Sequence, residues 1–198
     1  MASSNASLQQ LPSAPSSQAS PDIPVLISTG STPSTSNRLV AESIFDFLFM
    51  GMVETFHQSP SEIENDREAV YFKLESIGYR VGLAMAERFT KDRPRFIDNL
   101  DAVKFICKDF WIAIFKKQID NLKTNHRGVY VLSDNNFRWF SRMSTDGTGV
   151  DASRQAFPYL AFPCGLIRGA LANLGVASVV IAEVTILPQL TFQVKISK

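Results

Sequence analysis

The first strongly patterned stretch of the chain, residues 38–56, predicts a helix whose apolar surface is wider than one small domain can cover. At the α-helical step, its apolar side chains fill an arc of roughly 200°, whereas a helix lying on its own core needs about half of that. Leaving four or five such side chains in water would cost on the order of 6 to 15 kcal/mol, which is comparable to the stability of a domain. We therefore expect a second protein chain to cover part of this set: Val40, Ile44, Phe45, Phe47, Leu48, Phe49, Met52 and Phe56.

A second helix is predicted to begin at Ser59, Pro60 and Glu62, which together form a capping signal. Its apolar positions recur at three- and four-residue steps up to about residue 88. We expect four of them to join the partner interface: Val70, Leu74, Ile77 and Val81. Gly78 and Gly82 lie one turn apart on the same helix, and such a pair predicts close approach by the backbone of a neighbouring helix.

The remaining pattern alternates between helices and strands. Residues 101–115 carry a wide apolar face that is typical of a core helix, and a helix from about residue 164 ends at Gly175. The stretches 128–133, 177–184 and 192–196 are rich in β-branched residues or alternate in polarity, as strands do. This order predicts an α+β fold, in which two hairpins form a four-stranded antiparallel sheet with helices packed on one face.

Two regions depart from this pattern. Residues 1–36 hold eleven serines, five of the ten prolines, one charged side chain and no aromatic residue, so we expect a disordered or linker-like tail followed by one domain, 37–198. Residues 138–154 show little periodicity and predict a surface loop insertion. Trp139 and Phe140 suggest that the start of this loop docks on the domain.

Charge and cysteine content limit which kinds of partner and which cellular compartment are expected. A net charge of +1 gives no electrostatic reason to expect nucleic acid or an anionic membrane surface as the main partner. The N-terminus lacks a signal-peptide pattern, and no run of 18 apolar residues exists, so neither secretion nor a transmembrane segment is expected. Cys107 and Cys164 sit in apolar runs, which predicts buried, reduced thiols in a cytoplasmic protein.

The chain shows no motif for catalysis, cofactor binding or metal binding. Its two histidines, His57 and His126, lie in polar connecting segments, and neither has a supporting catalytic motif. No glycine-rich phosphate loop or metal-ligand spacing is present. We therefore expect neither an enzyme nor a cofactor. Arg168 lies among apolar residues and needs partners for its donors, either inside the fold or on another chain.

Beyond these patterns, the runs 77–82, 100–111, 123–132 and 164–171 strongly resemble the small subunits of the transport protein particle, TRAPP, and look most similar to the subunit 6 branch. The likeness covers nearly all of residues 38–198 and is most specific between residues 100 and 137. The tail and the segment 138–154 lie outside it.

The resemblance implies a scaffold subunit without chemistry of its own, which forms a heterodimer with a sister small subunit through its first two helices. In that family the whole complex tethers vesicles and acts as a nucleotide exchange factor for a Rab GTPase in endoplasmic reticulum to Golgi and Golgi transport. The expected location is therefore cytoplasmic and peripheral at Golgi and endoplasmic reticulum membranes, with further TRAPP subunits as partners.

One family feature does not carry over. The core sister subunit holds a fatty acyl chain on a cysteine shortly before its central helix, but residues 94–100 contain no cysteine, and Phe96 occupies about that place. Cys107 lies further along, inside the predicted helix. The alternative to the scaffold hypothesis is a binding module of the same fold that keeps an acyl chain or other apolar ligand near the aromatic residues of 105–115.

Overall fold

The computed structural model describes residues 40–58, 66–125, 127–144 and 149–197, all within the unit Val40–Lys198. The helices are α1 (Glu42–Gln58), α2 (Asp66–Thr90), α3 (Asn99–Phe105), α4 (Trp111–Phe115), α5 (Val150–Ala156) and α6 (Ala161–Asn173). The strands are β1 (Asn121–Thr124), β2 (Val129–Asp134), β3 (Ser178–Ile186) and β4 (Gln189–Ile196). The predicted α+β fold with two hairpins is confirmed.

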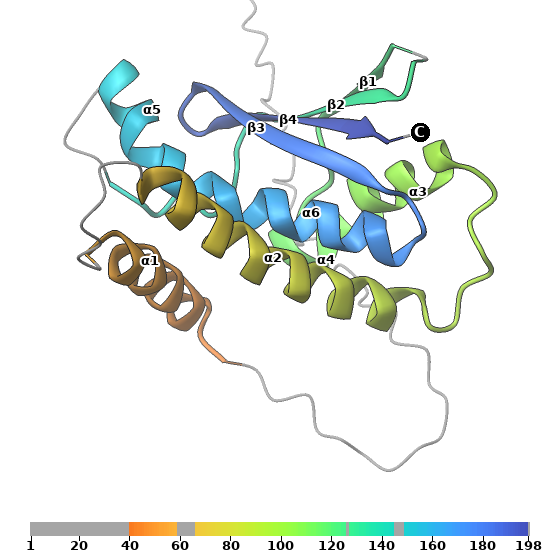
Figure 1. Ribbon diagram of the computed structural model, residues 1–198, viewed down its shortest axis with the longest axis horizontal. Coiled ribbons are helices and arrows are strands. Elements are labelled where there is room, and N and C mark those ends of the chain that lie inside the picture. Colours follow the sequence, from red (N-terminus) through yellow and green to blue (C-terminus); the bar gives the residue numbers. More distant parts are fainter. Residues whose placement is uncertain (1–39, 59–65, 126, 145–148, 198) are drawn as a thin grey trace, which may run out of the picture. The chain divides into compact units, whose positions relative to one another are not determined.

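The four strands form one antiparallel sheet in the order β1-β2-β4-β3. Tyr130 lies opposite Val194, and Leu132 lies opposite Phe192, and all four side chains are buried. Figure 1 shows α6 running along one face of the sheet, with α2 on the far side of α6. The inward residues of the strands and the buried residues of α6 therefore form the centre of the core.

Helices α2 and α6 cross with their backbones in close contact, which only glycine permits. A Cβ added at Gly78 would lie 2.1 Å from the carbonyl oxygen of Phe162, and one added at Gly165 would lie 2.0 Å from that of Glu75. Gly82 and Gly169 are equally tight, so each helix contributes two glycines to the contact. This confirms the prediction that Gly78 and Gly82 permit close backbone approach.

The central helix is continuous from α3 to α4 through a π-helical turn, Ile106–Phe110. The amide of Trp111 donates to the carbonyl of Ile106, five residues back, which is the signature of such a turn. The Trp111 indole donates to buried Asp134 at 2.9 Å, and Lys117 donates to the same carboxylate at 2.7 Å. These bonds fasten the end of the central helix to the end of β2.

The end of α6 follows the predicted cap. Gly175 has φ +80°, and its amide donates to the carbonyl of Ala172 at 3.0 Å, while the amide of Val176 donates to that of Leu171 at 2.9 Å. This pair of bonds is a Schellman motif, which explains the glycine. Both cysteines are free and buried, as expected.

The structure differs from the predicted surface loop at residues 138–154. Trp139 and Phe140 are buried, so its beginning is part of the core, and its end belongs to α5, whose seven residues are too few to show a helical period. β1 also had no recognisable pattern, since only four residues pair there. The capping signal at Ser59, Pro60 and Glu62 lies outside the described residues, as does His126.

Candidate partner-binding surface

The buried face of α1 is fixed by an aromatic cluster. Phe49 and Val53 are 1% and 2% exposed. The Phe49 ring lies 5.2 Å from that of Trp139 and 5.4 Å from that of Phe162, measured between centroids. Phe45 adds a contact with Trp139 at 4.9 Å. Met52 and Phe56 are half-buried beside the same core.

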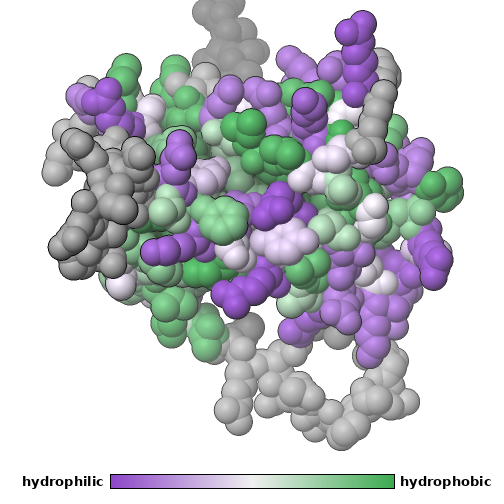
Figure 2. Space-filling model, in the orientation of Figure 1, coloured by the Kyte–Doolittle hydropathy of each residue, from purple (hydrophilic) through white to green (hydrophobic). Residues whose placement is uncertain are grey.

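The opposite face of α1 is apolar and open. Val40, just before the helix, and Ile44, Phe47 and Leu48 within it have exposed fractions of 75%, 58%, 72% and 67%. We call these four residues the α1 stripe: Ile44, Phe47 and Leu48 lie at helical spacing along one side of α1, and Val40 precedes the helix. Figure 2 shows apolar side chains gathered at the lower left, over the position of α1. The prediction that part of the apolar arc lacks an intramolecular home is confirmed for the described chain.

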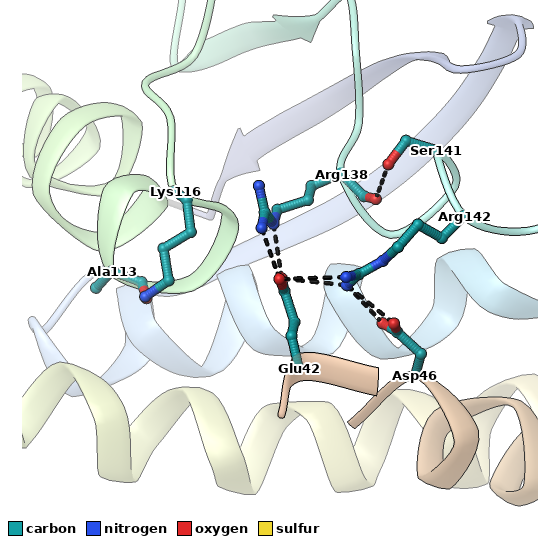
Figure 3. Close-up of polar contacts among 7 residues, drawn as sticks. All are labelled: Glu42, Asp46, Ala113, Lys116, Arg138, Ser141 and Arg142. Atoms are coloured by element: carbon teal, nitrogen blue, oxygen red, sulfur yellow. Dashed lines mark hydrogen bonds and ion pairs between the residues drawn. The ribbon is translucent and has the colours of Figure 1, made fainter. Parts of the chain in front are cut away.

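Ion pairs hold α1 in this rotation (Figure 3). Both carboxylate oxygens of Glu42 accept from Arg138, at 2.6 Å each. Arg142 reaches the same carboxylate and Asp46, with ion-pair distances of 3.2 and 2.9 Å. The hydrogen bond from Arg138, aided by the charges of both arginines, lowers the pKa of Glu42 to about 2. One helical side is thus tied to the segment after β2, which leaves the stripe facing outward.

Three residues of the predicted interface lie inside the chain itself. Phe49, Val70 and Leu74 are at most 4% exposed and belong to the core, where a partner cannot reach them in this conformation. Ile77 and Val81 on α2 are half-buried and pack against the core. The accessible part of the predicted set is therefore the α1 stripe, and the other predicted residues are half-buried.

Among the exposed apolar side chains that sequence reasoning missed is that of Phe72 on α2. It is 68% exposed and lies on the side of the helix away from Val70 and Leu74. Its signal in the sequence was an aromatic residue at a position where the helical period calls for a polar one. Nearby, the Tyr71 and Phe157 rings stack at 5.6 Å. They border a hollow of about 230 Å³ that is also lined by His57, Val70, Leu74, Arg154 and Pro158.

Arg168 finds its partners within the fold. Its guanidinium makes two hydrogen bonds to Glu75, one of them 2.8 Å from Nη2 to Oε2. It also lies 4.4 Å from the centre of the Tyr79 ring. Of the two alternatives left open by the sequence, the internal ion pair is the one observed.

Both cysteine thiols are held in the neutral form. Burial raises the pKa of both the Cys107 and the Cys164 thiol to about 12, so neither is a thiolate at neutral pH. His57 is exposed at the end of α1. Phe96 packs against Phe105, with ring centroids 5.3 Å apart. In the described ranges, no three His, Cys, Asp or Glu side chains are grouped so that they could hold a metal ion.

A large exposed apolar face on a helix is typical of a subunit that binds another protein. Residues 45–197 match the family model described as "Transport protein particle (TRAPP) component". The chain therefore belongs to the TRAPP family.

Relatives place it in the subunit 6 branch. It is 51% identical over 158 residues to trafficking protein particle complex subunit 6b of Danio rerio, and 52% identical over 157 residues to subunit 6B of Homo sapiens. Each match covers 79% of this chain and 98% of the relative. Identity to subunit 6A of Bos taurus is 44%, over 79% of this chain and 97% of that one.

A solved structure supports the fold. The crystal structure of a trafficking protein particle complex subunit 3 from Naegleria fowleri, covalently bound to palmitic acid, aligns with a TM-score of 0.61 and 17% identity. It covers 79% of this chain and 98% of that chain.

Within the described residues, none of the helices has the length and apolar composition needed to cross a membrane.

Proposed function

We propose that this chain is a non-catalytic scaffold subunit of the TRAPP complex, which forms a heterodimer with a sister small subunit through the α1 stripe. The observation that carries the proposal is the α1 stripe, a set of four large apolar side chains that are each more than half exposed. Covering them would contribute on the order of 4 to 8 kcal/mol to association.

The anchoring of α1 to the domain supports the same proposal. Because Phe49, Val53 and the Glu42–Arg138 pair fix the rotation of the helix, the stripe is presented without a folding step on binding. A surface ordered in advance loses less conformational entropy when a partner docks. The half-buried residues of the predicted set, among them Ile77 and Val81 of α2, are the proposed rim of the interface.

The wider role follows from the family. We propose that the chain works in endoplasmic reticulum to Golgi and Golgi vesicle transport as part of the tethering complex, with Rab nucleotide exchange carried out by the whole assembly. Its location would then be cytoplasmic and peripheral at those membranes, through the complex. Further TRAPP subunits are the proposed additional partners.

The alternative function, an apolar-ligand or acyl-chain binding module, has less support. The aromatic residues of 105–115, which motivate it, pack on one another and on the sheet: the ring centroids of Trp111 and Phe115 lie 4.4 Å apart, and those of Trp111 and Phe192 of β4 lie 5.4 Å apart. Extraction of the purified chain with organic solvent, followed by mass spectrometry, tests this alternative. Recovery of a stoichiometric lipid would favour it.

The scaffold proposal is tested by co-expression with the sister subunit. We expect Phe47→Glu and Leu48→Glu to abolish co-purification, because each places a charge in the centre of the buried interface. Phe45→Glu is a poorer test, since Phe45 also packs on Trp139 within the fold. Ile97→Glu is the matched control, because Ile97 is 94% exposed but lies far along the chain, between α2 and α3.

Circular dichroism of each variant shows whether the fold is intact. Retention of the sister subunit by both α1 variants, at the level of the natural chain, would overturn the proposal.

A further inference from the structure

The described helices contain five glycines, and four of them have the same explanation. Gly78, Gly82, Gly165 and Gly169 each face a backbone carbonyl of a crossing helix, at 2.0 to 2.1 Å from where a Cβ would lie. A side chain at any of these positions would push α2 and α6 apart. In this fold, a helical glycine therefore marks a point where another helix passes with its backbone in contact.

Gly51 of α1 is the exception, because a Cβ built there would meet nothing within 4 Å. Glycine in the middle of a helix lowers its stability relative to alanine, and no contact inside the described chain compensates for this. The residue is exposed. The conformational freedom of glycine is not used either, since Gly51 is an ordinary helical residue without a positive φ.

The position of Gly51 on the helix is informative. At 100° per residue, its direction from the helix axis lies between those of Phe47 and Leu48. It also points in nearly the same direction as Ile44, two turns earlier. It is thus a notch in the middle of an otherwise bulky apolar surface. Thr55, one turn further on, turns its hydroxyl inward and donates to the Gly51 carbonyl at 2.6 Å. The stripe is thereby extended toward the C-terminus of α1 without an unpaired polar group.

We infer that a helix of the sister subunit crosses α1 at Gly51 with its backbone in contact, as α6 crosses α2. This inference rests on the proposed function and specifies its geometry. The large side chains of Ile44, Phe47 and Leu48 would flank the crossing, and the notch would receive the backbone or a small side chain of the partner's helix. Small residues at a crossing let two helices approach to about 8 Å between their axes, the short end of the usual range.

The inference predicts opposite effects of one substitution on folding and on binding. Gly51→Ala should raise the melting temperature of the isolated chain by about 2 to 4 °C, because alanine is the better helix former and open space surrounds the new methyl group. The same change should weaken binding to the sister subunit by roughly tenfold, and Gly51→Leu by about a hundredfold, since each added group keeps the helices apart.

Ser43→Ala is the matched control. Ser43 is exposed on α1 but lies off the stripe, and the change also favours the helix. It should leave the affinity unchanged. Isothermal titration calorimetry of purified subunits, with the melting temperature of each isolated variant measured in parallel, gives both quantities.

The results distinguish failure of the close crossing from failure of the proposed function. If Gly51→Ala and Gly51→Leu bind as tightly as the natural chain while Phe47→Glu does not bind, the stripe is the interface but the close crossing is wrong. If Phe47→Glu and Leu48→Glu also bind normally, the proposed function itself fails. Tighter binding by Gly51→Leu would likewise overturn the inference, because it would mean that the notch is a gap rather than a contact.

Discussion

Helices α1 and α6 are about equally apolar, yet the fold treats them in opposite ways. Ten of the thirteen residues of α6 are buried, because it lies between α2 and the sheet and meets protein on both sides. Only two of the seventeen residues of α1 are buried, because it lies at the margin of the domain and meets protein on one side. Equal hydrophobicity therefore does not determine burial, and the excess on α1 is what makes it a candidate for association.

The largest expected effect tests the two faces of α1 against each other. Phe49→Ala should lower the free energy of unfolding by about 3 to 5 kcal/mol, because it leaves a cavity among Trp139, Tyr159 and Phe162. Phe47→Ala, two residues away on the exposed face, should change it by no more than about 0.5 kcal/mol. Urea unfolding of the isolated chain measures both. Equal losses would mean that the two faces are not distinct.

The next effect contrasts the glycines of the two helices. Gly165→Ala should destabilise the chain by roughly 1 to 3 kcal/mol or more, because the new methyl group would lie 2.0 Å from the carbonyl of Glu75 and must force α2 and α6 apart. Gly51→Ala should instead stabilise the isolated chain by about 1 kcal/mol. The same unfolding experiment gives the sign of each change. A stabilising Gly165→Ala would contradict the close crossing described for the core.

The sequence was sufficient for those features that depend on local periodicity. The wide arc of α1, the paired glycines of α2 and the cap at Gly175 could all be recognised from spacing alone. It could not indicate which half of the arc is buried, because that depends on Trp139 and Phe162, which reach α1 only through tertiary packing. The Glu42–Arg138 pair spans 96 residues and is invisible to a local pattern for the same reason.

The smallest effect concerns the ion pairs that support α1 at the margin of the domain. The pKa of Glu42 is lowered to about 2 in the folded chain, from an ordinary value of 4.5, so its contribution to stability is complete above about pH 4.5 and is lost as the pH falls toward 2. Because the Glu42, Arg138 and Arg142 side chains are each more than a third exposed, solvent screening limits this contribution to about 1 kcal/mol or less.

Glu42→Gln removes only the contribution of the Glu42 charge to stability, since every other carboxylate, including Asp46 beside Arg142, is retained. The natural chain should be the more stable one at pH 6, and the difference should shrink through pH 4 and vanish near pH 2. Added salt should reduce the difference at pH 6, because it screens exposed charges. A difference independent of pH would mean that Glu42 acts through packing or neutral hydrogen bonding, and that the rotation of α1 is set by the aromatic cluster alone.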